Sequence, residues 1–104
     1  PGYLYLISHA EWELLQIGIT NVPERRLHKH EGTGWTTLDV RGPMDGQLTR
    51  DLETGILKAL KKRGAVFAKT AGIKKFDGWS EAWTEKSYHA DKLSQLVDLV
   101  YEDD

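Results

Sequence analysis

Two stretches near the start of the chain combine aromatic and aliphatic residues in short runs that predict β-strands. Residues 3–7 read Tyr-Leu-Tyr-Leu-Ile and residues 15–19 read Leu-Gln-Ile-Gly-Ile, a length and composition that favour strands. Residues 8–13 between them suit a hairpin connection. Because successive side chains of a strand point to opposite faces, the aliphatic positions 4, 6, 15, 17 and 19 are expected to share the core face. The opposite face would carry Tyr3, Tyr5, Gln16 and Gly18.

A short polar helix is predicted after the second strand. Pro23 fits the first position of a helix, and Gly32 and Gly34 mark its end after about residue 30. Leu27 and Val22 are the apolar residues available to anchor it. A helix with so little apolar surface is expected on the rim of the fold.

Residues 46–63 show the clearest helical pattern, because leucine and isoleucine recur every four residues along one stripe. Gly55 inside this helix costs about 1 kcal/mol relative to alanine, which indicates close packing against another element. A final amphipathic helix is marked by Leu93, Leu96, Val97 and Val100. The stripe of the longer helix consists of Leu48, Leu52, Ile56 and Leu60.

The remaining pattern completes the predicted fold. Residues 35–41 alternate as a third strand that ends at Gly42 and Pro43, residues 64–78 form a glycine- and lysine-rich loop, and residues 79–84 form a short strand. The expected architecture is an α/β chain of the α+β type, with a small central three-stranded antiparallel sheet flanked by helices.

Composition narrows the class of protein. A chain of 104 residues is sufficient for one domain, so residues 1–104 are expected to form a single domain, excised from a longer protein because the sequence starts at Pro1. Ten aromatic residues argue against disorder, and no apolar run approaches the roughly 18 residues of a spanning helix. The absence of cysteine excludes a disulfide framework and a thiolate metal site, and it fits a cytoplasmic location.

Charge is unevenly distributed although the net charge is only −2. Residues 58–75 contain seven Lys or Arg residues and no acid. Such a stretch is a candidate surface for nucleic-acid phosphates. From charge alone, a solvated helix end and loop is the favoured alternative, since lysines near a helix C-terminus are stabilised by its dipole.

An ordered set of polar residues accompanies these elements. Gly2-Tyr3-Leu4-Tyr5-Leu6 is followed by Gln16-Ile17-Gly18, then by Arg26 eight residues after that glycine, His30 one helical turn further, and Glu53 in the long helix. This set resembles the GIY-YIG nuclease superfamily from residue 2 to about residue 60, and more loosely through residues 77–83. Two positions depart from the motifs, because Tyr3 stands in place of the glycine and Gln16 in place of the second tyrosine.

The resemblance implies a metal-dependent endonuclease that hydrolyses DNA. Tyr5 would orient or activate the attacking water, Arg26 would bind the scissile phosphate, and Glu53 would hold Mg²⁺ or Mn²⁺. His30 would contact a phosphate oxygen or pass a proton, and Tyr3 belongs to the same catalytic set. Phosphodiester hydrolysis needs a nucleophile and charge relief on the phosphate, and a single carboxylate can hold Mg²⁺, which keeps most of its waters.

A phenol is a weak base at neutral pH, because its pKa is about 10. Arg26 or the metal ion would have to lower the pKa of Tyr5. Arginine suits the phosphate because its planar guanidinium stays charged and donates bidentate hydrogen bonds. Gln16 is a candidate to hold the water that a tyrosine would otherwise hold.

DNA is the expected partner, with backbone contacts that position it without reading sequence. Nothing in the chain resembles a base-reading module, so other domains of the parent protein are expected to supply specificity. The predicted backbone contacts are Arg25, Lys29, Lys58, Lys61, Lys62, Lys74 and Lys75.

Each residue also has a simpler interpretation. Glu53 and Arg26 could be ordinary exposed helix residues, and the tyrosines half-buried strand residues. His9 and His89 are interpreted as surface residues, and the favoured role of Trp35, Trp79 and Trp83 is packing.

Two other functions remain open. One is a non-catalytic nucleic-acid-binding or regulatory module on the same scaffold, supported by Gln16. The other is a protein-interaction domain that uses Trp79, Trp83 and the acidic end of the chain at residues 102–104.

Overall fold

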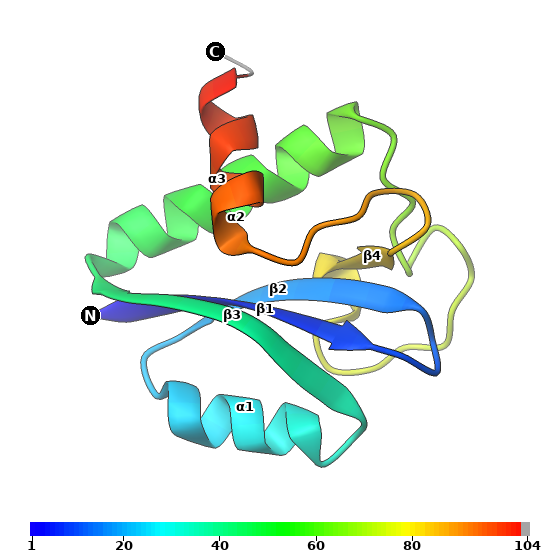
Figure 1. The fold of residues 1–104 in the computed structure, drawn as a ribbon, viewed down its shortest axis with the longest axis horizontal. Helices are drawn as coiled ribbons and strands as arrows, with labels where there is room; N and C mark the ends of the chain where they lie inside the picture. Colours follow the sequence, from blue (N-terminus) through cyan, green and yellow to red (C-terminus); the bar gives the residue numbers. More distant parts are fainter. Residues whose placement is uncertain (103–104) are drawn as a thin grey trace.

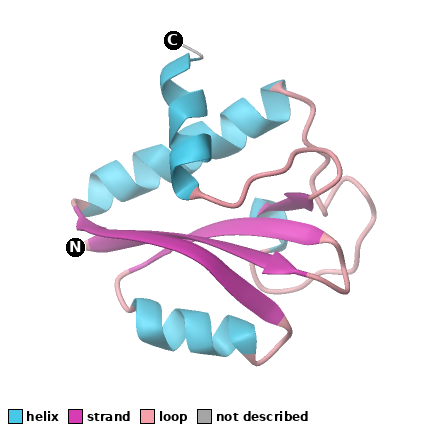
Figure 2. Ribbon diagram, viewed as in Figure 1, coloured by secondary structure: helices cyan, strands magenta, loops and turns pink. Residues whose placement is uncertain are grey.

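The computed structural model describes residues 1–102, so Asp103 and Asp104 of the acidic end lie outside the described residues. The chain has the predicted α+β class, with a sheet in the strand order β3-β1-β2-β4 and every pairing antiparallel. Helix α1 covers one face of the sheet, and α2 and α3 cover the other (Figures 1 and 2). The elements are β1 (Gly2–His9), β2 (Leu14–Thr20), α1 (Pro23–Glu31), β3 (Trp35–Met44), α2 (Gly46–Lys62), the 3₁₀ helix η1 (Trp79–Glu81), β4 (Ala82–Thr84) and α3 (Leu93–Glu102).

The sheet has four strands, so the prediction of three was wrong. Residues 79–81 form η1, and only Ala82–Thr84 remain extended to pair with Leu14–Gln16 of β2. A strand of three residues carries little periodic signal, and its pairing depends on a distant segment of the chain. The short β4 therefore covers only the first part of the free edge of β2.

The third strand is also longer than predicted, because it continues through Gly42 and Pro43 to Met44. β3 is an edge strand. Proline is tolerated there because an edge strand does not need a backbone N–H on the side that has no neighbouring strand. The register between β1 and β3 shifts between Gly2 and Leu4, which accommodates the irregular end of the strand.

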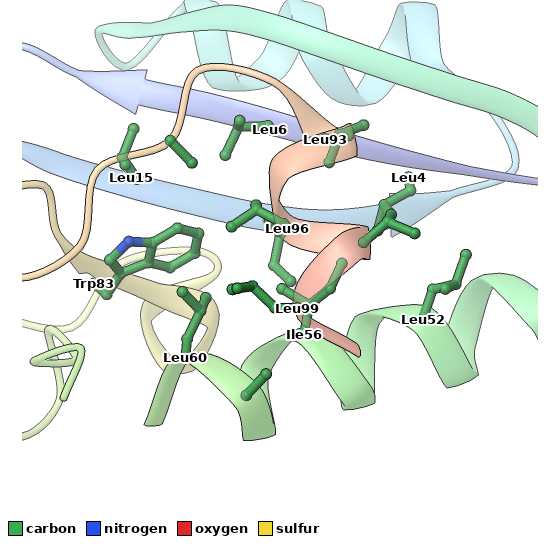
Figure 3. Close-up of a cluster of buried hydrophobic side chains, with 14 residues drawn as sticks. Leu4, Leu6, Leu15, Leu52, Ile56, Leu60, Trp83, Leu93, Leu96 and Leu99 are labelled. Carbon is green, nitrogen blue, oxygen red and sulfur yellow. The ribbon is translucent and has the colours of Figure 1, made fainter. Parts of the chain in front are cut away.

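The main hydrophobic core lies between the sheet and the helices α2 and α3 (Figure 3). The prediction that the aliphatic positions 4, 6, 15, 17 and 19 share this face is confirmed, since Leu4, Leu6, Leu15 and Ile17 belong to this core and Ile19 packs against it. Burial of side chains of this size stabilises the fold by about 1.5–3 kcal/mol each.

The predicted stripe of α2 is buried at Leu52, Ile56 and Leu60, but Leu48 is 47% exposed. The neighbouring Thr49 is buried instead, and a Cβ atom at Gly2 would collide with its side chain. The first turn of α2 therefore turns a threonine toward the start of β1, and the apolar stripe begins one turn later than predicted.

A second buried cluster covers the opposite face of the sheet. Tyr5, Ile7 and Leu14 pack there with Trp35, and side chains from the loop 64–78 complete the cluster. The face that carries Tyr5 is therefore also buried, and α1 is anchored by His30, which is 3% exposed, and by Leu27. Val22, the other predicted anchor, is 37% exposed.

His9 is buried, so its prediction as a surface residue was wrong. Its Nε2 donates a hydrogen bond of 3.0 Å to the Thr33 carbonyl, and its Nδ1 accepts from the Trp12 N–H at 3.2 Å. The ring stacks on Trp12 with 3.9 Å between centroids. The hairpin between β1 and β2 folds these groups together, which the local sequence does not reveal. His89 is exposed, as predicted.

The tryptophans pack as predicted. Trp35 and Trp83 are buried, and Trp83 donates its indole N–H to the Tyr88 carbonyl at 2.9 Å. Trp79 is half-buried, and its indole N–H donates to Ile73 at 2.7 Å. Within the described part of the chain, no helix has both the length and the apolar character to cross a membrane.

Candidate functional site

A cavity of about 280 Å³ lies beside the second half of β2. β4 pairs only with Leu14–Gln16, so no strand of residues 1–102 pairs with Ile17–Ile19 on the side away from β1. All three residues of Ile17–Ile19 line the cavity. Because the edge of the sheet is open here, residues from helices on opposite faces of the sheet can reach one place.

Four of the predicted site residues line this cavity: Tyr5 of β1, Arg26 and His30 of α1, and Glu53 of α2. Tyr5 lies opposite Gly18 in the register of β1 and β2. A Cβ atom at residue 18 would collide with the ring and hydroxyl of Tyr5. The glycine therefore lets the phenol lie across β2 toward the cavity.

The Tyr5 hydroxyl and His30 Nε2 are 3.1 Å apart. Burial raises the pKa of Tyr5 to about 12, because it outweighs the lowering effect of Arg26. Burial also lowers the pKa of His30 below its usual 6.5. At neutral pH the phenol is therefore protonated and the imidazole is neutral. In the tautomer with a proton on Nδ1, Tyr5 donates its hydrogen bond to His30.

The expectation that a cation lowers the pKa of Tyr5 is therefore not met by Arg26. The guanidinium of Arg26 lowers the pKa of Tyr5, but burial of the hydroxyl and the negative charges of three carboxylates raise it. Loss of hydration disfavours an anion more than one partly exposed cation favours it.

Glu53 is half-buried, and its pKa is raised to about 7. Burial is the larger cause, and the negative charge of Glu81 is the smaller one. Glu81 belongs to η1 and lines the same cavity. A hard divalent cation held by both carboxylates would remove the repulsion that Glu81 exerts on the charge of Glu53. Residues 1–102 contain no group of three or more potential metal ligands. Mg²⁺ or Mn²⁺ held by two carboxylates would have to take most of its remaining ligands from water.

Arg26 contacts an acid that sequence reasoning missed. Its Nη1 lies 3.3 Å from Asp77 Oδ2, and Lys29 Nζ lies 3.9 Å from the same oxygen. Asp77 comes from the loop 64–78 and lines the cavity. The loose resemblance through residues 77–83 included both Asp77 and Glu81, but nothing in the local pattern placed them beside Arg26 and Glu53.

Gln16, which replaces the second tyrosine of the motif, also lines the cavity. Its side chain is 1% exposed, and its Oε1 has no hydrogen-bond partner among the described residues. A buried acceptor in this state costs about 1–3 kcal/mol. Gly78, with φ +86°, lies against the carboxamide, and a Cβ atom there would collide with it. The buried carboxamide is thus held in the wall of the cavity.

The other predicted residues lie elsewhere. Tyr3 is half-buried against Gly42 and does not line the cavity. Arg25 and Lys29 flank Arg26 in a neighbouring depression. The remaining predicted DNA contacts separate into two sets. Lys58 and Lys61 line a further cavity, and the exposed positions outside it are Lys62, Lys74 and Lys75.

Comparison of the chain with protein-family models, curated proteins and solved structures gave no match. The assignment of function therefore depends on the geometry of the cavity and on the chemistry of its side chains.

Proposed function

We propose that this chain is a metal-dependent endonuclease domain that hydrolyses DNA phosphodiester bonds. The observation that supports it is that Tyr5, Arg26, His30 and Glu53 line one cavity from three different elements. Glu81 of η1 adds a second carboxylate to the same cavity. Phosphodiester hydrolysis needs proton transfer and charge neutralisation at the phosphate, and a phenol, a guanidinium, an imidazole and a carboxylate can supply them.

Arg26 would bind the scissile phosphate. The half-exposed guanidinium is held by Asp77 in a contact that a phosphate oxygen can replace. An exposed ion pair of this kind contributes about 0–1 kcal/mol, whereas a bidentate arginine–phosphate pair is stronger. Asp77 would thus keep Arg26 oriented until DNA arrives.

Tyr5 and His30 would handle the proton of the attacking water. With its pKa about 12, Tyr5 does not act as a phenolate in the resting protein. Instead its oxygen would accept a proton from the water as its own proton passes to His30 Nε2, 3.1 Å away. A neutral imidazole suits this step because its Nε2 is free to accept. Glu53 and Glu81 would hold the divalent ion, which supplies charge neutralisation at the phosphate.

The test is cleavage of a supercoiled plasmid in Mg²⁺ or Mn²⁺ by the parent, Glu53→Gln and Arg26→Ala. Each substitution removes a group that acts on the transition state, so the cleavage rate is expected to fall about 100-fold or more. Glu31→Gln and Arg41→Ala change the same charges at exposed positions outside the cavity, and they should cleave at the parental rate. Cleavage that survives both cavity substitutions would contradict the assigned roles.

The second candidate is a non-catalytic nucleic-acid-binding module on this scaffold. It is favoured by Gln16, because a carboxamide cannot replace a phenol as an acid or base. On this proposal DNA binding would depend on salt but not on divalent ions or on Glu53, and the parent would not cleave the plasmid. Plasmid cleavage, together with the dependence of DNA binding on salt, divalent ions and Glu53, therefore separates the candidates.

A further inference from the structure

A second cavity, of about 450 Å³, adjoins the candidate site along α2. Three lysines line it, Lys58 and Lys61 from α2 and Lys69 from the loop 64–78. Its apolar lining comes from Leu57 and Phe67. We call this cavity the lysine groove.

The charge of the lysine groove is of one sign. No Asp or Glu is among the residues that line it, although the whole chain has more acids than bases. All three lysines are exposed. Lys58 and Lys61 are three positions apart, so they project from the same side of the helix. Concentrated positive charge of this kind attracts a polyanion.

The groove also offers neutral contacts. Thr70 and Ser80 contribute hydroxyl groups to its lining, which can donate hydrogen bonds to phosphate oxygens. Leu57 and Phe67 are half-buried, so they present apolar surface to a flat or weakly polar group such as a sugar or base. An acidic peptide would use the lysines equally well; DNA is favoured because the groove adjoins the site proposed to cleave it.

Two walls of the groove continue into the walls of the candidate site. Leu57 lies one helical turn after Glu53 on α2, about 6 Å along the axis, and Ser80 immediately precedes Glu81 in η1. Glu53 and Glu81 line the first cavity, and Leu57 and Ser80 line the second. A linear polyanion bound in the first cavity therefore has a continuous path along α2 and η1 into the groove.

We propose that the lysine groove binds the DNA backbone next to the scissile phosphate, with Lys58, Lys61 and Lys69 on its phosphates. The proposal rests on the proposed function, because it takes DNA as the substrate of the adjoining site.

The test is the salt dependence of binding of a 20-base-pair fluorescent duplex, measured by anisotropy in EDTA. The groove variant carries Lys58→Gln, Lys61→Gln and Lys69→Gln. The matched control carries Arg41→Gln, Lys86→Gln and Lys92→Gln, which remove the same charge from exposed side chains outside the groove. Each lost phosphate contact lowers the slope of log K against log salt by about 0.9.

The magnitude of this slope is therefore expected to be about 2–3 smaller for the groove variant than for the parent, and the variant should bind at least tenfold more weakly at low salt. The control variant should stay close to the parent. Circular dichroism and thermal unfolding of all three proteins establish that they are folded. Equal weakening of both variants, no binding by the parent, or binding of a poly-glutamate peptide in place of the duplex would each overturn the proposal.

Failure of the proposed function gives a different result. Binding in EDTA requires neither cleavage nor metal, so a parent that binds through the groove but never cleaves DNA would keep the groove and refute the hydrolase. If the parent cleaves DNA and the groove variant binds the duplex as tightly as the parent does, the proposed hydrolase is retained and the proposed role of the groove is refuted.

Discussion

Glu53 occupies the candidate site at a cost in stability. It occupies the polar edge of a helix whose apolar stripe is buried, and it shares its cavity with Glu81. Burial and the neighbouring carboxylate both oppose its ionisation. The same two features suit a cation ligand, since the ion would compensate both.

The raised pKa of Glu53 predicts a pH-dependent stability. Its pKa of about 7 in the folded chain exceeds the ordinary 4.5, so between these values the folded state binds a proton that the unfolded state has released. Stability therefore decreases as pH rises from about 4.5 to 7, and the full penalty remains above pH 7. Glu53→Gln removes this penalty.

In urea unfolding in EDTA, Glu53→Gln should be about as stable as the parent at pH 4 and more stable by about 1 kcal/mol at pH 8. This value is smaller than the full pKa shift implies, because Glu53 is only half-buried and solvent screens its charge. Glu31→Gln, at an exposed position, serves as the control. A stability difference that does not change between the two pH values would show that burial does not raise the pKa of Glu53.

At the scale of elements, the contact between α2 and α3 explains a glycine in the middle of the long helix. A Cβ atom at Gly55 would lie 3.1 Å from Val100 Cγ1 and 3.3 Å from Cγ2. Such contacts are tighter than ordinary packing, so the glycine lets α3 approach α2. The prediction of close packing at Gly55 is thereby confirmed.

A double-mutant cycle tests this contact. In a Val100→Ala background, Gly55→Ala should stabilise the protein by about 1 kcal/mol, because alanine has the higher helix propensity. In the parent this gain should disappear or reverse, since the new methyl group meets Val100. The expected coupling is at least about 0.5 kcal/mol by urea unfolding. Additive effects of the two substitutions would mean that the helices move apart freely.

At the scale of the whole molecule, the candidate site is assembled from both sheet-covering layers and from the loop 64–78. Glu53 and Glu81 are brought together only when α2 and η1 have packed on the sheet. A ligand that needs both groups binds the folded chain and not the unfolded chain, so it should stabilise the entire fold.

Mg²⁺ is therefore expected to raise the Tm of the parent at pH 7.5. At ten times its Kd the ion contributes about 1.4 kcal/mol, which corresponds to a rise of several degrees for a chain of this size, at about 4–8 °C per kcal/mol. Glu53→Gln should lose most of this rise, and NaCl at equal ionic strength should not produce it. An equal rise in the variant would place the metal away from Glu53.

Local patterns in the sequence were sufficient to predict most elements and the faces of β1 and β2. Alternation and helical spacing are properties of neighbouring residues, so Leu4 and Leu6 were correctly separated from Tyr5, and Gly55 was correctly associated with close packing. The resemblance carried by Tyr5, Arg26, His30 and Glu53 implies a shared site, and all four residues line one cavity.

Only the tertiary structure decided what surrounds those four residues. Asp77, Glu81 and Lys69 reach α1 and α2 from a distant segment, and the burial of His9 depends on contacts with Trp12 and Thr33. These placements depend on which side of the sheet a long loop crosses and where a three-residue strand leaves an edge open. Long-range packing determines both the path of the loop and the position of the short strand. The spacing of hydrophobic residues along the chain reports only on local structure, so it does not reveal either of them.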